Sequence, residues 1–299
     1  MFVIILYAAF VLGAKAQTVK TIIIDPGHGY PTLNAHGQYS YESDLTLIYG
    51  QMLAKKIRDS FPGIKVLLTR DDRNDAGHIE DPSLANRYRG QFANNNHGDL
   101  FVSIHCNDAP PVHHSEVVGH RKETYYTGKK KKRKKHVRTV PIYRYWTTPS
   151  EVTGTETYIW AANTNDSKAD FVKSRTDQDS SDLEGEKDST SYFESTDTEA
   201  KIMATLRTKK YFDRSLILAQ LVQDEFANQG RVDRGVKQRN NKRIWVLQAT
   251  AMPAILVETG FITNPGEENY MNSERGKEEI SGAIFNAVRQ YILQVEKRS

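Results

Sequence analysis

Three short apolar segments in this sequence each lead directly to a residue that can bind a metal ion or transfer a proton. The segments TIIID, FVSI and AILV lead to His28, His105 and Glu258, respectively. Short segments rich in Ile and Val are typical of buried strands, and the Pro-Gly pair before His28 is typical of a tight turn. The fold must therefore bury three strands and still present these polar side chains at the strand ends.

Segments in which apolar residues recur every three or four positions separate most of the strand-like segments. This spacing predicts amphipathic helices, and their alternation with strands is typical of an α/β sheet covered by helices. The sequence shows neither an internal repeat nor a linker between two cores, so we predict one domain: a mostly parallel, twisted sheet with helices on both faces. Helices are expected over residues 41–61, 82–95, 211–228 and 274–295, and further strands over residues 64–69, 154–160 and 243–248.

Two segments of opposite charge interrupt this pattern, at about residues 110–150 and 162–205. In the first, residues 121–138 carry ten Lys or Arg and one Glu, although the whole chain has a formal charge of only +4. In the second, residues 166–199 carry eleven Asp or Glu and four Lys or Arg. Neither segment contains enough apolar residues for a core of its own, so both are expected to be insertions in the one domain.

The N-terminus has the pattern of a secretory signal peptide. Residues 2–12 carry no charge and are too few for a transmembrane helix, and Ala14-Lys15-Ala16 fits a small-x-small cleavage site. A basic segment before the apolar one is absent, and a buried first strand is the alternative interpretation. We expect residues 1–16 to be a signal peptide and residues 17–299 to form the exported catalytic domain.

The three strand ends predict a metal site. The carboxyl ends of parallel strands form the ligand crevice of an α/β sheet, so His28, His105 and Glu258 are expected to converge there. Glu42, at the start of the first helix, is either an ordinary first-turn acid or a third ligand. Two imidazoles and a carboxylate with an open fourth position are typical of catalytic zinc, so we expect one Zn²⁺ on His28, Glu42 and His105. Glu258 would then deprotonate the metal-bound water.

Four segments carry a resemblance to a known family. The segments IIIDPGHGY, YESDLTL, FVSIHCNDA and LQATAMPAILVETGF, in this order, resemble motifs of the zinc-dependent N-acetylmuramoyl-L-alanine amidases of type 3, which are cell-wall hydrolases. The resemblance implies that His28, Glu42 and His105 bind zinc and that Glu258 is the catalytic acid and base. It also implies hydrolysis of the amide between N-acetylmuramic acid and L-alanine of the peptidoglycan stem peptide, in cell-wall remodelling or cell separation. It covers residues 19–109, 154–160 and 211–295.

The resemblance gives the acidic insertion a regulatory interpretation. Related enzymes carry a helix there, from which a glutamate can occupy the open position of the zinc and hold the enzyme inactive. Displacement of this segment by an activator protein is a hypothesis for this chain. Glu184 and Glu186 are the candidates for this blocking role, with Glu194 behind them. The alternative is a disordered acidic loop. For the basic insertion we expect a solvated loop, because runs of charged residues are usually solvated. The alternative is a hairpin that binds anionic wall polymer.

The sequence leaves three alternatives to an amidase, which are a binding module, a zinc peptidase and a nucleic-acid-binding protein. A non-catalytic peptidoglycan-binding module would not need all four catalytic-type residues, and a zinc peptidase of another specificity is the nearest enzymatic rival. Nucleic acid is not an expected partner, because the lysine run lacks interleaved aromatic residues and the protein is expected to be exported. The expected location is the periplasm or the cell envelope, without membrane attachment after signal cleavage.

Overall fold

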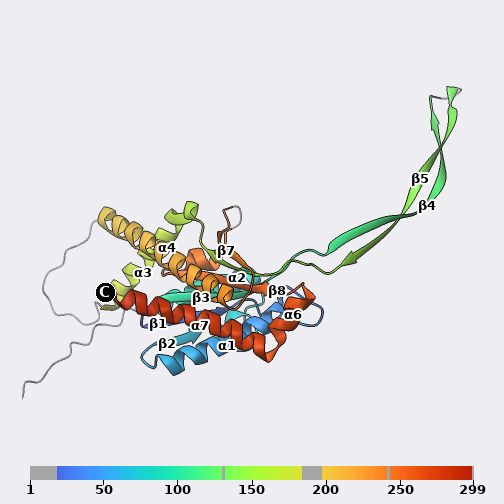
Figure 1. Cartoon of the computed structure of the whole chain (residues 1–299). Helices are drawn as coiled ribbons and strands as arrows, with labels where there is room; N and C mark the ends of the chain where they lie inside the picture. The colour runs from blue at the N-terminus through green and yellow to red at the C-terminus, as the bar shows by residue number, and fades with distance from the viewer. Residues whose placement is uncertain (1–18, 130–131, 184–196, 241–242, 298–299) are drawn as a thin grey trace, which may run out of the picture.

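A six-stranded mixed sheet forms the centre of the computed structural model (Figure 1). The structure describes residues 19–129, 132–183, 197–240 and 243–297. The strand order is β2-β1-β3-β8-β6-β7; the first four strands are mutually parallel, and β6 runs antiparallel to β8. The predicted mostly parallel α/β sheet is thus confirmed. The strands are β1 (Thr21–Pro26), β2 (Lys65–Leu68), β3 (Leu100–Asn107), β6 (Thr155–Ile159), β7 (Asp233–Gln238) and β8 (Ala254–Phe261).

Helices cover both faces of this sheet, as the sequence predicts. Helices α1, α4 and α7 contribute to one hydrophobic core, and α2 and α5 to a second core on the opposite face. Helix α3 packs against α4 and α5. The helices are α1 (Glu42–Ser60), α2 (Pro82–Asn95), α3 (Asn165–Leu183), α4 (Asp197–Asn228), α5 (Trp245–Ala249), α6 (Pro265–Asn272) and α7 (Glu274–Lys297), with short 3₁₀ turns at η1 (Ala76–His78) and η3 (Ala162–Thr164).

The alternation of side chains along the central strands supplies both cores. Ile22 and Ile24 of β1 face the core beneath α1 and α7, while Ile23, between them, faces the other core. All three are fully buried. A strand covered on both faces has no solvated side, which explains why TIII is a continuous apolar run without polar alternation.

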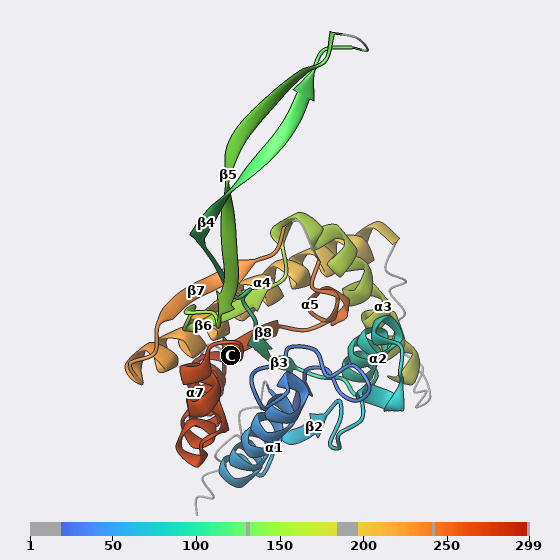
Figure 2. The same ribbon diagram turned by 90° about the vertical axis from the view of Figure 1, so that its right-hand side faces the viewer.

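The basic insertion forms a long antiparallel hairpin of β4 (Val112–Thr127) and β5 (Lys134–Thr148). It projects from the body of the domain as a twisted two-stranded ribbon (Figure 2). The predicted solvated loop was therefore wrong. The lysine run occupies only the turn and the start of β5, whereas β-branched and aromatic residues on both sides of it favour strands.

Two differences from the sequence predictions concern helices. The strand predicted over residues 243–248 was wrong: α5 begins there, because a short apolar run alone does not distinguish a buried helix from a strand. Helix α4 begins at Asp197, and its first half was not predicted because the large apolar residues Ile202, Met203 and Leu206 are exposed, whereas the small residues Ala204 and Thr208 are buried. The described parts of the acidic insertion, residues 162–183 and 197–205, are helical, as the resemblance implies, and not the alternative disordered loop.

Some expectations fall outside the described residues. The expected signal peptide, residues 1–16, is one of them, and so are Glu184, Glu186 and Glu194. Among the helices that the structure describes, none combines the length and the hydropathy needed to cross a membrane.

Candidate active site

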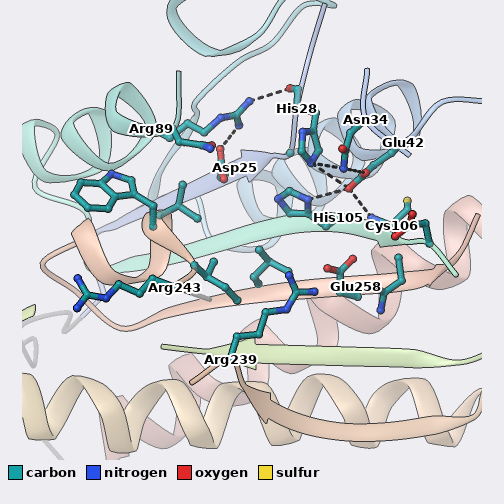
Figure 3. Close-up of a pocket in the computed structure, with 18 residues that line it drawn as sticks. Asp25, His28, Asn34, Glu42, Arg89, His105, Cys106, Arg239, Arg243 and Glu258 are labelled. Carbon is teal, nitrogen blue, oxygen red and sulfur yellow. Dashed lines mark hydrogen bonds and ion pairs between the residues drawn. The ribbon is translucent and has the colours of Figure 1, made fainter. Parts of the chain in front are cut away.

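His28, Glu42 and His105 lie together at the carboxyl edge of the sheet, although they come from three different elements (Figure 3). His28 follows β1, Glu42 is the first residue of α1, and His105 lies near the end of β3. Glu42 Oε1 is 2.9 Å from His105 Nδ1 and 3.6 Å from His28 Nε2. One potential ligand atom from each residue lies within 4.8 Å of the others. The three residues can therefore hold one metal ion.

The turn after β1 presents His28 close to His105, and this approach requires a glycine at position 27. His28 has a positive φ of 56°. A Cβ on Gly27 would lie 2.4 Å from His105 Cε1, so the two imidazoles can approach only because residue 27 has no side chain. The rings meet edge to face, with centroids 4.8 Å apart. The glycine before His28 is thus required by the close approach of His105.

Two arginines hold the carbonyl groups of this turn. Arg70 Nη2 donates to the Gly27 carbonyl at 3.0 Å, and Arg89 Nη2 donates to the His28 carbonyl at 2.9 Å. Both arginines also donate to the Pro26 carbonyl. The peptide oxygens that β1 leaves without strand partners are therefore satisfied by buried guanidinium groups, which fix the orientation of His28.

Arg89 is itself paired with two carboxylates. It forms ion pairs with Asp25 and Asp75, and only 2% of its side chain is exposed. Thr69 and Ser103 donate hydroxyl hydrogen bonds to Asp25 at 2.5 and 2.7 Å. Burial alone would raise the pKa of Asp25, but the Arg89 guanidinium and the two hydroxyls outweigh it and hold this pKa below its usual range. Asp25 is therefore ionised in the folded protein.

Two further contacts orient Glu42. The Asn34 side-chain amide donates to Glu42 Oε2 at 2.7 Å and lies 3.0 Å from His28 Nε2. The backbone N–H of Cys106 donates to Glu42 Oε1 at 3.0 Å. The Cys106 thiol is buried in the core, as its alternation with His105 predicts. Sequence reasoning missed Asn34, whose loop gives no periodic signal.

The ionisation states of His28 and Glu42 suit metal binding. Burial, reinforced by the neighbouring His105, lowers the pKa of His28 to about 4, so its imidazole is neutral near pH 7. Burial opposes ionisation of Glu42, but the His105 hydrogen bond and the charges of both histidines overcome it and lower the pKa to about 2. Burial acts against protonation of His105, yet its bond to Glu42 raises the pKa. A neutral imidazole and a carboxylate are the forms that bind metal ions.

Glu258 lies on β8 in register with His105 of β3. Its carboxylate is 7% exposed and faces the same pocket as the three clustered residues (Figure 3). Within the part of the chain that the structure describes, its buried Oε2 has no hydrogen-bond partner. Burial raises the pKa of Glu258 to about 7, with the His105 charge opposing the shift and the Glu42 charge adding to it. A carboxylate in this state can both accept and donate a proton near neutral pH.

The pocket around these groups is polar and has a volume of about 430 Å³, within the usual range for ligand sites. On the side away from His28 it is lined by Arg239 and Arg243 (Figure 3). Trp245 also lines the pocket. Sequence reasoning missed all three, although Arg239 and Arg243, before and at the start of the apolar segment RIWVLQ, are a visible signal. They give the pocket cationic groups near the candidate catalytic carboxylate.

The comparison with protein families agrees with this site. The model of a family described as N-acetylmuramoyl-L-alanine amidase, Amidase_3, matches residues 22–290. The chain belongs to this family. The predicted family is thus confirmed, and the match also spans the β4–β5 hairpin and α3 of this amidase-family chain.

Several curated relatives are similar to this chain. An uncharacterized cell wall amidase of Bacillus anthracis is 26% identical over 274 residues, which are 91% of this chain and 35% of the relative. The chain thus spans about a third of that relative's length. The uncharacterized protein YqiI of Bacillus subtilis is 24% identical, and the match covers 92% of this chain and 86% of YqiI. The amidase AmiC of Neisseria meningitidis is 36% identical over 89 residues, 30% of this chain and 20% of AmiC.

Solved structures confirm the fold. An N-acetylmuramoyl-L-alanine amidase of Clostridium difficile aligns with a TM-score of 0.53 at 24% identity, over 92% of this chain and 97% of the other. AmiC2 of Nostoc punctiforme aligns with a TM-score of 0.54 at 19% identity, over the same shares of the two chains. The arrangement of sheet and helices is therefore that of solved amidase domains.

Replacement of Gly27 by alanine is expected to disrupt the metal cluster. The new Cβ would displace the His105 ring, so we expect zinc affinity, measured by competition with a chelating dye, to fall roughly 10-fold to 100-fold. Gly282→Ala is the matched control, because a Cβ there meets nothing within 4 Å, and it should bind zinc as the wild type does. Wild-type zinc affinity in Gly27→Ala would contradict the role of this close approach.

The buried Asp25 predicts acid sensitivity. Its pKa is lower in the folded protein than the value of about 3.9 in an unfolded chain, so its stabilising contribution is complete above about pH 4 and is lost as the pH falls below it. We expect the free energy of unfolding in urea to decrease below pH 4, and to decrease less steeply in Asp25→Asn. Asp59→Asn, at an exposed site, should keep the wild-type slope. Equal slopes in all three proteins would contradict the prediction.

Proposed function

We propose that this protein is a zinc-dependent peptidoglycan amidase. The observation that supports it most strongly is the position of an unpaired, buried carboxylate, Glu258, beside the His28–Glu42–His105 cluster. The family match supports the reaction class. The bond cleaved is the amide between the lactyl group of N-acetylmuramic acid and L-alanine of the stem peptide.

The donor set fits one zinc ion. Two imidazole nitrogens and one carboxylate oxygen are borderline ligands that Zn²⁺ favours, and three protein ligands leave a position open for substrate. The hydrogen bonds that orient the proposed ligands also fit a metal site, because Asn34 and the Cys106 N–H each donate to one oxygen of Glu42. A bound Zn²⁺ supplies Lewis-acid chemistry, polarising the amide carbonyl and lowering the pKa of a water molecule.

Glu258 moves the proton in this proposal. With its pKa near neutrality, its carboxylate accepts a proton from the attacking water and then returns it to the leaving amine of L-alanine. The overall products are a free lactyl carboxylate and a free amine, so water is consumed and the proton balance closes. The unpaired Oε2 leaves Glu258 free for this transfer, because no protein hydrogen bond among the described residues has to break first.

Arg239 and Arg243 are proposed to bind the carboxylates of the stem peptide. Both line the pocket, on the side away from His28. A guanidinium group binds a carboxylate in a bidentate manner, which orients the peptide as well as holding it. Such contacts would place the amide between the histidine cluster and Glu258.

Replacing Glu258 by glutamine tests the proposed chemistry. We expect Glu258→Gln to retain about one zinc per chain while its rate of peptidoglycan hydrolysis falls roughly 10²-fold to 10⁴-fold, since it removes the proton acceptor and no proposed ligand. Zinc content and release of L-alanine amines from intact glycan are the measurements. Glu274→Gln is the control, because that side chain is 93% exposed.

The outcomes separate the alternatives. Zinc without hydrolysis in the wild type would favour a blocked site or a binding module, and cleavage within the stem peptide would favour a zinc peptidase. Wild-type activity in Glu258→Gln, or no zinc in either protein, would contradict the proposal.

We also propose that the acidic insertion regulates the site. Lys168 of α3 is fully buried and donates to the Leu247 and Thr250 carbonyls at 2.6 Å, which joins the insertion to α5 and thus to the pocket. The CwlD amidase of Clostridioides difficile has been solved in complex with the GerS lipoprotein; it aligns with a TM-score of 0.51 at 19% identity, over 92% of this chain and 99% of CwlD. That complex supports a protein partner as the activator here.

Glu184 and Glu186 remain the proposed blocking residues. Replacing both by alanine should raise the basal rate of hydrolysis about tenfold. This corresponds to the loss of about 1.4 kcal/mol of interaction between the blocking residues and the site. This double variant keeps Lys168, whereas deletion of residues 166–199 would also remove its contacts with α5. Asp166→Ala with Asp170→Ala is the matched control, with two acids removed from the start of α3. An unchanged or lower rate in a folded Glu184→Ala, Glu186→Ala protein would contradict the proposal.

The proposed place of action is outside the cytoplasm, in the periplasm or cell envelope, where peptidoglycan lies. The expected signal peptide at residues 1–16 supports this proposal.

A further inference from the structure

The β4–β5 hairpin is the largest feature that the proposed reaction does not use. Its first strand begins five residues after Asn107, which lines the pocket, and the chain returns to the sheet at Thr155, the first residue of β6. Figures 1 and 2 show it projecting from the body of the domain. At about 3.3 Å per residue, strands of this length reach roughly 50 Å. The hairpin therefore presents its turn far from the catalytic edge.

The outer part of the hairpin, residues 121–129 and 132–138, is here called the basic tip. These described residues carry eight Lys or Arg and one Glu. The single acid, Glu123, pairs with Arg138. Among the described residues, no ion pair with a carboxylate is formed by the remaining cations of the tip, which are Arg121, Lys122, Lys129, Lys132, Arg133, Lys134 and Lys135. The tip thus presents a nearly uncompensated positive charge to its surroundings.

The strand register distributes these cations over both faces of the ribbon. Lys122 pairs with Thr139 and Arg121 with Val140, so neighbouring cations point to opposite faces. Lys134 and Lys135 are divided between the faces in the same way. A flat anionic surface would meet only one of these faces, whereas a flexible linear polyanion can follow both.

Aromatic side chains hold two of the arginines in place. Arg133 lies 4.8 Å from the centroid of the Tyr126 ring, and Arg138 lies 5.4 Å from that of Tyr125. His136 stacks on Tyr125 as well, with centroids 5.2 Å apart. Guanidinium groups held on rings lose less side-chain freedom when they bind a phosphate, and they keep their donors directed outwards.

We propose that the basic tip is a docking surface for a linear, phosphate-bearing polymer of the cell wall. Charge complementarity selects a polyanion, and the planar donors of arginine fit phosphate oxygens. The assignment of the polymer to the wall rests on the proposed function. The docked tip would hold the enzyme on its insoluble substrate while the catalytic edge reaches the peptide at some distance.

Two other anionic partners fit less well. The turn sequence GKKKKR contains no apolar side chain, so it offers nothing to insert into a lipid bilayer. Single-stranded nucleic acid is bound through bases stacked on free aromatic faces, but Tyr125 and Tyr126 already carry stacked cations or imidazole. Both partners serve as competitors in the test.

The test compares binding of poly(glycerol phosphate) to full-length wild type and to a tip variant with four cations replaced by glutamine. Near physiological ionic strength, of about 0.15 M, we expect the variant to bind at least about tenfold more weakly, and its slope of log K against log salt to be smaller by roughly 3, because about four phosphate contacts are lost. A surface variant that loses four exposed lysines elsewhere should bind as the wild type does. The tip variant replaces Arg121, Lys122, Lys134 and Lys135, and the surface variant replaces Lys65, Lys201, Lys209 and Lys210.

Equal losses in the two variants, or no binding by the wild type, would overturn the inference. Tighter binding to a single-stranded oligonucleotide of equal phosphate number, or to anionic phospholipid vesicles, would overturn it as well. Binding is read without hydrolysis, so a wild type that binds the polymer but does not cleave peptidoglycan supports the docking surface and contradicts the proposed function. Unchanged thermal unfolding and unchanged zinc content in the tip variant exclude misfolding as the cause.

Discussion

The candidate site depends on one buried interaction, the ion pairs of Arg89 with Asp25 and Asp75. Removing one partner of such a pair typically costs about 3–5 kcal/mol, because the other charge is left buried and uncompensated. Here the same guanidinium also binds the carbonyls of Pro26 and His28, so the cluster joins β1, the loop around Asp75 and α2 to the turn that carries a proposed zinc ligand. The stability of the fold and the position of His28 therefore have the same cause. Loss of the Arg89 ion pairs is therefore expected to lower the stability of the fold and to displace His28.

Two glutamates in one pocket differ in pKa by several units because of what surrounds them. Burial opposes the ionisation of Glu42, but the His105 hydrogen bond, the charges of both histidines and the Cys106 N–H outweigh it and lower its pKa to about 2. Burial raises the pKa of Glu258 to about 7, and its buried Oε2 has no hydrogen-bond partner in the described part of the chain. Divergent environments of this kind assign a fixed charge to one carboxylate and a mobile proton to the other. The surroundings thus distinguish the candidate metal ligand from the candidate base without reference to any relative.

The sequence predicted those parts of the fold that local patterns encode. Continuous apolar runs identified β1, β3 and β8, and helical spacing identified α1, α2 and α7, because burial on two faces or on one stripe leaves a clear periodicity. Parallel connectivity then brought His28, His105 and Glu258 to one edge. Asn34 and Arg89 were missed since their partners lie elsewhere in the chain, and such contacts leave no periodic signal. The β4–β5 hairpin was only the alternative interpretation of the basic insertion, because the lysine run outweighed the strand-forming residues on both sides of it.

Strand β6 connects the remaining parts of the molecule. The hairpin enters it at Thr155, and η3 and α3 follow it, so both charged insertions are attached to its ends. Between them lies Glu156, which is in register with Glu258 and is held by Arg234 and Lys237 at 2.8 and 2.6 Å. Burial opposes the ionisation of Glu156, but these bonds lower its pKa to about 2, and its negative charge helps to keep the pKa of Glu258 high. Both insertions are therefore attached to the strand that pairs with the strand of the proposed catalytic base. Peptidoglycan is insoluble, so a hydrolase that acts on it benefits when the segment that docks and the segment that regulates are both anchored beside the group that moves the proton.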